Sequence, residues 1–238
     1  MADGAVDLVL LDAVEYLRLA DLGLEPVFAG KEYTPIEYLL LVNQISNIRG
    51  IENLRGKSIT FASLTDANLG RMWTEIMLDD RHLGRIENFF GSIKNESKVS
   101  AAVLPVFFGK TDAVVVARVS FEVMQEMNPQ LKTKMRVLAV SPGFIDGLLC
   151  VPRAKRTANS ALLKAIAGLQ EDVAGQQILM VFRTRQLVPV DGAALERVRG
   201  MWTRYLRLPK AAAQPPGSGA ILGPSGLASP PVKDREPR

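Results

Sequence analysis

The sequence of 238 residues has almost no cysteine and almost no histidine. Cys150 is the single cysteine, so no disulfide can form within the chain, and a disulfide-stabilised scaffold is excluded. His82 is the single histidine, and its place between Arg81 and Leu83 is typical of a surface residue. We therefore expect neither a histidine-rich metal site nor a Ser-His-Asp triad, and no metal or other cofactor.

Long apolar runs and targeting signals are missing as well. The chain starts MADGAVDLVLLDAVEYLRL, which has no basic region followed by an apolar segment and a small-residue cleavage site. No apolar run reaches the ~20 residues that a membrane helix needs. Taken as written from Met1, the sequence predicts a soluble protein that is not exported and stays cytoplasmic.

Neither the charge nor the motifs point to nucleic acid or to catalysis. The net charge is +4, but Lys and Arg are scattered, with no run of five or more like charges, so we expect no nucleic-acid partner. The motifs GxGxxG, GxxxxGK[ST], GxSxG and HExxH are absent. Without a nucleophile–base pair, we expect that the protein is not an enzyme.

Apolar runs of strand length alternate with helical patterns along the chain. The strands are expected at 7–11, 24–28, 38–42, 58–62, 86–90, 112–117, 136–140 and 148–151. The helices are expected after Asp12 and at 69–78, 97–108, 120–127, 158–169, 174–182 and 195–205. This order predicts an α/β protein with mostly parallel sheets. From Pro209 on, the chain is rich in Ala, Pro, Gly and Ser, which predicts a disordered tail.

Small polar residues follow several expected strands, where the next helix begins. They are Ser63, Thr65 and Asn68 after 58–62, Ser92 after 86–90, and Arg118 and Ser120 after 112–117. Exposed amides at helix starts bind anions with help from hydroxyl groups, so converging strand ends would make an oxyanion site. The same residue types cap helices everywhere, and capping alone explains any one of them.

Two larger side chains allow a functional and a structural interpretation. Arg118 follows a strongly apolar strand, and its guanidinium group suits a carboxylate or a phosphate. The alternative is a salt bridge at the rim with Glu122 or Glu126. Tyr16, near the end of the first strand, is suited to the wall of a cleft, and the alternative is packing against its helix.

Seven segments share their residues with one known family. They are EYL at 15–17, EYLLLV at 37–42, LRGKSITF at 54–61, FFGS at 89–92, AAVLPVFFGKTDA at 101–113, NPQL at 128–131 and VLAVSP at 137–142. The most specific are 104–113 and the Asn128-Pro129 segment. Over residues 7–205, the chain resembles the phosphate/phosphite/phosphonate-type substrate-binding proteins of ABC transporters.

This resemblance implies a transferrin-like, two-lobed periplasmic-binding fold (type 2) with a ligand cleft between the lobes. Residues 1–45 would form the first part of lobe one, with 38–42 leading into the first crossing. Residues 46–140 would form lobe two, 141–208 the return to lobe one with the C-terminal helices, and 209–238 the disordered tail. Tyr16, the loop from Ser63 to Asn68, Ser92 and Arg118 match positions that face the cleft.

The sequence departs from the family pattern in two ways. The strand, helix and second strand that open the family fold would precede Asp7, so the resemblance implies an N-terminally truncated first lobe. The loop reads SLTDANLG and lacks the Ser-Gly pairing of phosphonate binders.

The resemblance predicts the solute-binding component of an ABC transport system. Such a protein closes on a small anionic, phosphate- or phosphonate-like ligand, works as a monomer with a membrane permease, and is periplasmic. The open alternatives are a cytoplasmic ligand-sensing domain, a truncated remnant that binds nothing, and an enzyme of the same fold.

Overall fold

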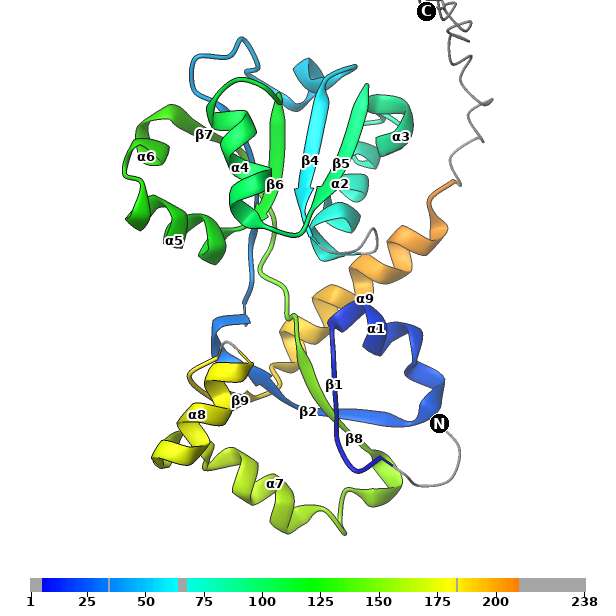
Figure 1. Cartoon of the computed structure of the whole chain (residues 1–238). Coiled ribbons are helices and arrows are strands. Elements are labelled where there is room, and N and C mark those ends of the chain that lie inside the picture. Colours follow the sequence, from blue (N-terminus) through cyan, green and yellow to red (C-terminus); the bar gives the residue numbers. More distant parts are fainter. Residues whose placement is uncertain (1–5, 34, 64–67, 183, 210–238) are drawn as a thin grey trace, which may run out of the picture.

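The structure is a computed structural model that describes residues 6–33, 35–63, 68–182 and 184–209. Two lobes lie one above the other, each built on a β-sheet with helices beside it (Figure 1). The tail that we expect to be disordered, residues 209–238, lies outside the described residues apart from Pro209.

The lower lobe in Figure 1 contains a four-stranded antiparallel sheet. Its strands in spatial order are β1 (Val9–Leu11), β8 (Leu148–Pro152), β2 (Leu24–Gly30) and β9 (Leu187–Pro189). Its helices are α1 (Ala13–Arg18), α7 (Ser160–Ala167), α8 (Val173–Val181) and α9 (Gly192–Arg207). Strand β8 comes late in the sequence but lies between β1 and β2. The lower sheet is therefore complete only after the chain has returned from the upper lobe.

The upper lobe contains a five-stranded mixed sheet. Its strands in spatial order are β5 (Ser92–Glu96), β4 (Ser58–Ala62), β6 (Ala113–Ala117), β3 (Tyr38–Asn43) and β7 (Met135–Val140). Its helices are α2 (Leu69–Asp79), α3 (Ile86–Phe89), α4 (Val99–Phe107), α5 (Arg118–Met127) and α6 (Gln130–Lys134).

Strand β3 shows why the centre of the upper sheet is buried on both faces. Its side chains alternate between two apolar clusters, as a strand between two helical layers requires. Leu39 and Leu41 pack in the cluster that includes α4, α5 and α6. Leu40 and Val42 pack in the cluster that includes α2, α3 and α9. The unbroken apolar run from Leu39 to Val42 is therefore the signature of a strand covered on both sides.

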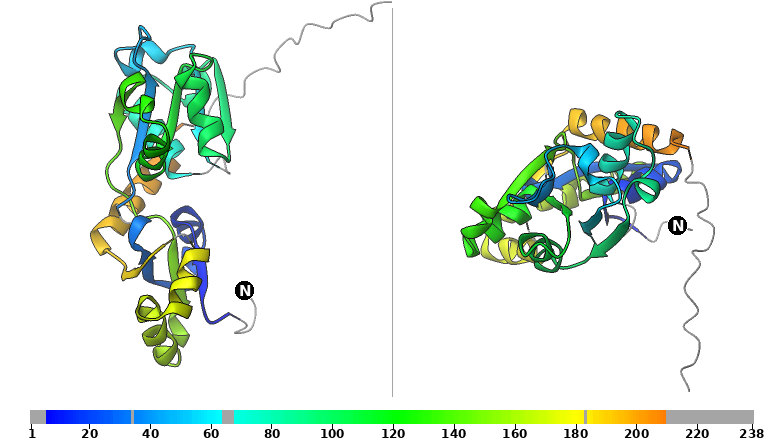
Figure 2. Two further views of the ribbon diagram at one scale, coloured as in Figure 1. Left: turned by 60° about the vertical axis from the view of Figure 1, so that its left-hand side comes forward. Right: turned by 90° about the horizontal axis from the view of Figure 1, so that it is seen from above.

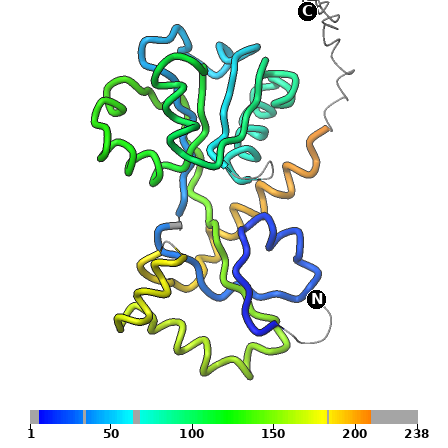
Figure 3. Tube along the Cα trace, viewed as in Figure 1, coloured from blue at the N-terminus to red at the C-terminus, as the bar shows by residue number. Residues whose placement is uncertain are grey.

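Two chain segments and one helix join the lobes. Ile36 and Phe144 lie opposite each other in the two crossing segments, and each backbone N–H donates to the other's carbonyl oxygen at 2.8 Å. The crossings are visible in Figure 3, and the left view of Figure 2 shows the lobes separated along the long axis. Helix α9 leaves the lower lobe and packs on α2 of the upper one, where Arg204 pairs with Asp80 at 2.5 Å.

The position of β3 changes the expected division of the chain. It pairs with β6 and β7 in the upper sheet, so the first crossing comes before Tyr38 and not after Val42. We therefore propose lobe boundaries near Ile36 and Phe144, in place of the expected divisions after residues 45 and 140.

The expectation of mostly parallel sheets is wrong. Among the described strands, β5 and β6 pair parallel to β4, while the other five pairings are antiparallel. Alternating strands and helices predict parallel neighbours only where successive strands share a sheet and lie side by side. Here β1 and β2 are separated by β8, and β3 lies between β6 and β7 and is antiparallel to both.

The expected strand at 86–90 is also wrong, because Ile86–Phe89 forms the short helix α3. The Phe90 N–H donates to the Ile86 carbonyl at 3.0 Å, and the buried Glu75 side chain accepts from the Ile86 N–H at 3.3 Å. Short apolar runs do not distinguish a buried helix turn from a strand. The strand of this region is β5, a polar edge strand that begins at Ser92.

Candidate functional site

The candidate site lies where the carboxyl ends of β4, β5 and β6 face the lower lobe. In the α/β part of the upper lobe, α2 follows β4, α4 follows β5 and α5 follows β6, so these three helices begin at the same edge of the sheet. Ligands of such sheets bind at this edge, where helix N-termini carry partial positive charge. The structure thus brings together Ser63, Asn68, Arg118 and Ser120 at one edge.

The helix starts at this edge differ in how their amides are satisfied. The Asn68 side chain caps α2 by accepting from the Arg71 N–H at 2.9 Å. Among the described residues, no side chain caps α4 or α5. The Arg118 N–H, the first of α5, donates to the Glu37 carbonyl oxygen. We propose that the amides after it, with those at the start of α4, are available to an anion. Thr65, which the sequence predicts in the same loop, lies outside the described residues.

Arg118 begins α5 and is held by a residue that sequence reasoning missed. Its Nε donates to Glu37 Oε2 at 2.5 Å, and its backbone N–H donates to the Glu37 carbonyl at 2.8 Å. Glu122, the expected alternative partner, lies at 4.0 Å. The Arg118 side chain keeps 39% of its surface exposed, so the guanidinium group is paired without being buried. Glu37 lies 81 positions away in sequence, and only the fold brings it to Arg118.

The side chain of Tyr16 points towards α9. The ring is buried, and its hydroxyl oxygen accepts from Arg199 at 3.1 Å. It lines a hollow that also includes Arg153 and Trp202 of the lower lobe. This geometry matches the packing alternative, and it sets Tyr16 apart from the strand-end residues.

Ser92 lies at the wrong end of its strand for the predicted site. It is the first residue of β5 and pairs in parallel register with Ser58, the first residue of β4. The expected site residues follow the carboxyl ends, which are about 13 Å away along five residues of strand. The helix at 86–89 explains the error, because only a strand at 86–90 would have put Ser92 at a carboxyl end.

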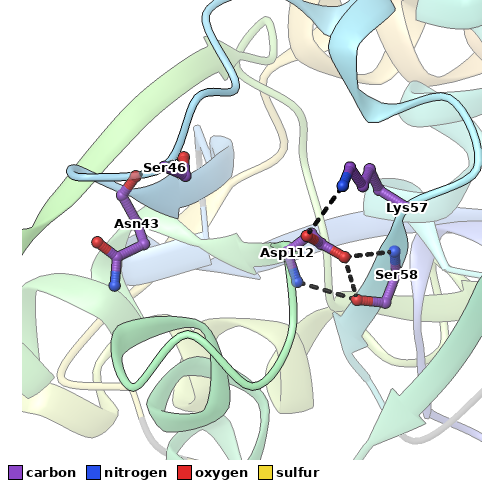
Figure 4. A network of polar contacts seen from close by, with 5 residues as sticks. All are labelled: Asn43, Ser46, Lys57, Ser58 and Asp112. Carbon is purple, nitrogen blue, oxygen red and sulfur yellow. Dashed lines mark hydrogen bonds and ion pairs between the residues drawn. The ribbon is translucent and has the colours of Figure 1, made fainter.

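The amino end of the sheet, shown in Figure 4, contains a structural network of polar contacts. Asp112 Oδ2 accepts from the Ser58 N–H at 2.9 Å and from the Ser58 hydroxyl at 2.6 Å, and Lys57 lies at 4.0 Å. Asn43, at the end of β3, donates to the Phe107 carbonyl at 2.8 Å. These contacts join β3, β4, α4 and β6, which accounts for the polar residues here without a ligand.

Two carboxyl groups of the lower lobe, those of Asp12 and Asp146, lie in the wall of one hollow. Burial raises the pKa of Asp146, and the neighbouring Asp12 raises it further. Burial, with the charges of Asp146 and then Asp12, raises the pKa of Tyr38 well above its usual value. No sequence pattern points to Asp146, because its partner at the start of α1, the Ala13 N–H, is 133 positions away.

The described residues contain no group of three or more His, Cys, Asp and Glu side chains arranged to hold a metal ion. None of the described helices is both long and apolar enough to cross a membrane.

Comparisons with known proteins place the chain in a family. Residues 1–195 match the family described as "ABC transporter, phosphonate, periplasmic substrate-binding protein". No curated protein sequence matches the chain. Among solved structures, XAC2383 from Xanthomonas citri bound to ATP is similar, with a TM-score of 0.67 and 16% identity over 86% of this chain and 79% of that one.

Two further structures share the fold. PhnD1 from Prochlorococcus marinus in complex with methylphosphonate has a TM-score of 0.64 and 18% identity, over 85% of this chain and 79% of that one. The putative periplasmic sulfonate-binding protein SsuA from Methylobacillus flagellatus has a TM-score of 0.55 and 14% identity, over 85% and 67%. These likenesses confirm the two-lobed α/β fold expected from the sequence.

Proposed function

Because this chain belongs to the periplasmic substrate-binding proteins of phosphonate ABC transporters, we propose that it captures a small phosphate- or phosphonate-like anion between its lobes. It delivers this solute to a membrane permease, as a monomer in the periplasm. The members of this family are the substrate-binding components of transporters, and we propose no catalytic step.

The observation that carries the proposal is the pair of helix starts at this edge, the second of which begins with Arg118. The amides of α4 and α5 have no side-chain cap among the described residues, and both helices begin at the carboxyl edge of the sheet. Amides at a helix start and a partly exposed guanidinium group form charge-assisted hydrogen bonds with an oxyanion. We propose Ser63, Asn68, Arg118 and Ser120, with Thr65, as the contacts of the upper lobe.

Closure of the lobes completes the site. The anion first contacts the upper lobe, and the lower lobe then adds contacts that exist only in the closed form, so the ligand shifts the population towards closure.

Thermal unfolding with methylphosphonate, phosphite and phosphate tests the proposal. We expect at least one of them to raise the Tm, because a ligand that binds only the folded state stabilises it. Arg118→Ala should weaken this binding about tenfold or more, the usual cost of a lost charge-assisted hydrogen bond. The matched control is Arg156→Ala, since Arg156 is also a half-exposed arginine paired with a glutamate, Glu25.

The two possible failures of this test mean different things. If none of the three anions raises the Tm of the folded protein, the proposed ligand class is wrong. If an anion raises the Tm equally in Arg118→Ala and Arg156→Ala, the ligand binds elsewhere and Arg118 is not a contact.

A further inference from the structure

An apolar groove of about 630 Å³ lies on the lower lobe, between the four-stranded sheet and helices α7 and α8. Figure 1 shows these two helices beside the sheet, away from the upper lobe. The volume falls within the roughly 300–1,000 Å³ of pockets that bind small molecules. The groove is separate from the strand ends of the upper lobe.

The walls of the groove are aliphatic and open to solvent. Leu10 of β1, Leu162 of α7, Ile178 of α8 and Phe182 line it, and each is between 40% and 51% exposed. Large apolar side chains that gather in one exposed concave surface mark a binding site more often than scattered ones do. Covering these side chains with a hydrocarbon chain would remove their apolar surface from water.

Among the described residues that line the groove, two are charged and both are acidic. They are Asp12, at the start of α1, and Asp146, before β8. Asp146 Oδ1 accepts from the Gly147 N–H at 3.1 Å and lies 3.5 Å from the Ala13 N–H. In the described part of the chain, neither carboxyl group forms an ion pair with a basic side chain. A ligand that suits this wall therefore carries positive charge next to an apolar body.

We propose that this groove binds an aliphatic amine, with its hydrocarbon chain along Leu10, Leu162 and Ile178 and its ammonium group between the carboxyl groups of Asp12 and Asp146. A cation placed between two neighbouring carboxyl groups favours their ionised forms and offsets the burial of Asp146. The site goes beyond the proposed function and does not depend on it, because its ligand has the opposite charge and binds on another surface.

A chain-length series measured by isothermal titration calorimetry on the whole chain tests the apolar part of the site. The ligands are hexylamine, octylamine and decylamine, each below its critical micelle concentration. Burial of one methylene should lower the Kd roughly fourfold, so the Kd should fall steadily along the series. Decanoate, with nearly the same hydrocarbon chain and a negative charge, should bind at least about tenfold more weakly than decylamine.

Paired variants on α8 test the position of the groove. Ile178→Asn places an amide in its wall, and Val181→Asn makes the same kind of change on the same helix outside the groove, where Val181 is 78% exposed. We expect Ile178→Asn to raise the Kd of decylamine about tenfold and Val181→Asn to leave it unchanged. Asp146→Asn keeps the shape of the side chain and should abolish the preference for decylamine over decanoate.

Three results would overturn the proposal. They are no binding of decylamine, equal binding of decylamine and decanoate, and equal effects of Ile178→Asn and Val181→Asn, which would indicate a general apolar surface. Circular dichroism confirms that each variant is folded. The response to methylphosphonate should be the same in Ile178→Asn as in the unchanged chain, so this test and that of the proposed function fail independently.

Discussion

At the scale of single residues, the pair of Arg118 and Glu37 sets the charge at the edge of the upper sheet. The two side chains are 39% and 36% exposed, so water screens their attraction, and the pair contributes little to stability. The ion pair matters for ligand binding, because an anion that binds Arg118 has to share the guanidinium group with Glu37 or displace that carboxylate. If Arg118 binds the oxyanion as we propose, Glu37 should weaken that binding.

Glu37→Gln should strengthen anion binding. The amide still accepts a hydrogen bond from Arg118 but no longer carries a negative charge, so the Kd of the anion that stabilises the unchanged chain should fall about two- to fivefold. Titration calorimetry on the two proteins measures the difference. Weaker binding in Glu37→Gln would show instead that Glu37 holds Arg118 in place for the ligand.

Cys150 gives an independent residue-scale test of the lower lobe. Burial between β1 and β2 raises its pKa to about 12, so about one thiol in ten thousand is ionised at pH 8. We expect iodoacetamide to leave the folded protein unmodified over a period in which the urea-unfolded protein reacts completely, as read by mass spectrometry. Equal rates in the two states would contradict the burial of β8.

At the scale of elements, two glycines in helices have opposite roles. A Cβ on Gly175 of α8 would lie 2.0 Å from the Leu169 carbonyl oxygen, so only glycine allows this helix to approach the preceding turn. A Cβ on Gly200 of α9 would meet no atom within 4 Å. The first glycine is required by a close backbone contact, and the second only adds flexibility to the unfolded chain.

Alanine at these two positions should therefore change the free energy of unfolding in opposite directions. Gly175→Ala should lower the free energy of unfolding by about 1–3 kcal/mol, because the backbone has to shift. Gly200→Ala should raise it by about 0.5–1 kcal/mol, since alanine is the better helix former. Urea denaturation followed by circular dichroism measures both changes. A stabilising Gly175→Ala would contradict the packing of α8 that forms the groove.

Elements that are strongly apolar or clearly capped were predictable from the sequence. The runs at 38–42 and 112–117 became β3 and β6, and Asp12 caps α1 as expected, with the Glu15 N–H donating to its carboxylate at 2.7 Å. The predictions that rested on weak sequence patterns were wrong. Ile86–Phe89 has the apolarity of a strand, but contacts with α2 make it helical, and β5 is a polar edge strand with no apolar pattern.

The candidate site was predictable only where it depends on strand ends. Ser63, Asn68, Arg118 and Ser120 follow strands that were correctly placed, and the fold brings them to one edge. Glu37 comes from the segment before β3, and its proximity to Arg118 depends on the pairing of β3 with β6. Sequence patterns of period 2 or 3.6 carry no information about such pairings.

At the scale of the whole molecule, the lobes share an apolar cluster while keeping separate sheets. Helix α9 contributes Leu195 and Val198 to the cluster that includes residues of both lobes. The two crossings at Ile36 and Phe144 are extended segments held by a pair of backbone hydrogen bonds. Such segments can take up the changes in backbone angles of a hinge, which the proposed closure of the lobes requires.

The central claim is that the lobes close on a small anion, and small-angle X-ray scattering with and without that anion tests it most directly. Methylphosphonate, phosphite and phosphate are the probes, each compared with the same concentration of chloride. The account predicts that the anion that raises the Tm also lowers the radius of gyration, and that Arg118→Ala reverses this change at equal ligand concentration. An unchanged radius of gyration with an anion that binds and stabilises the protein would contradict closure.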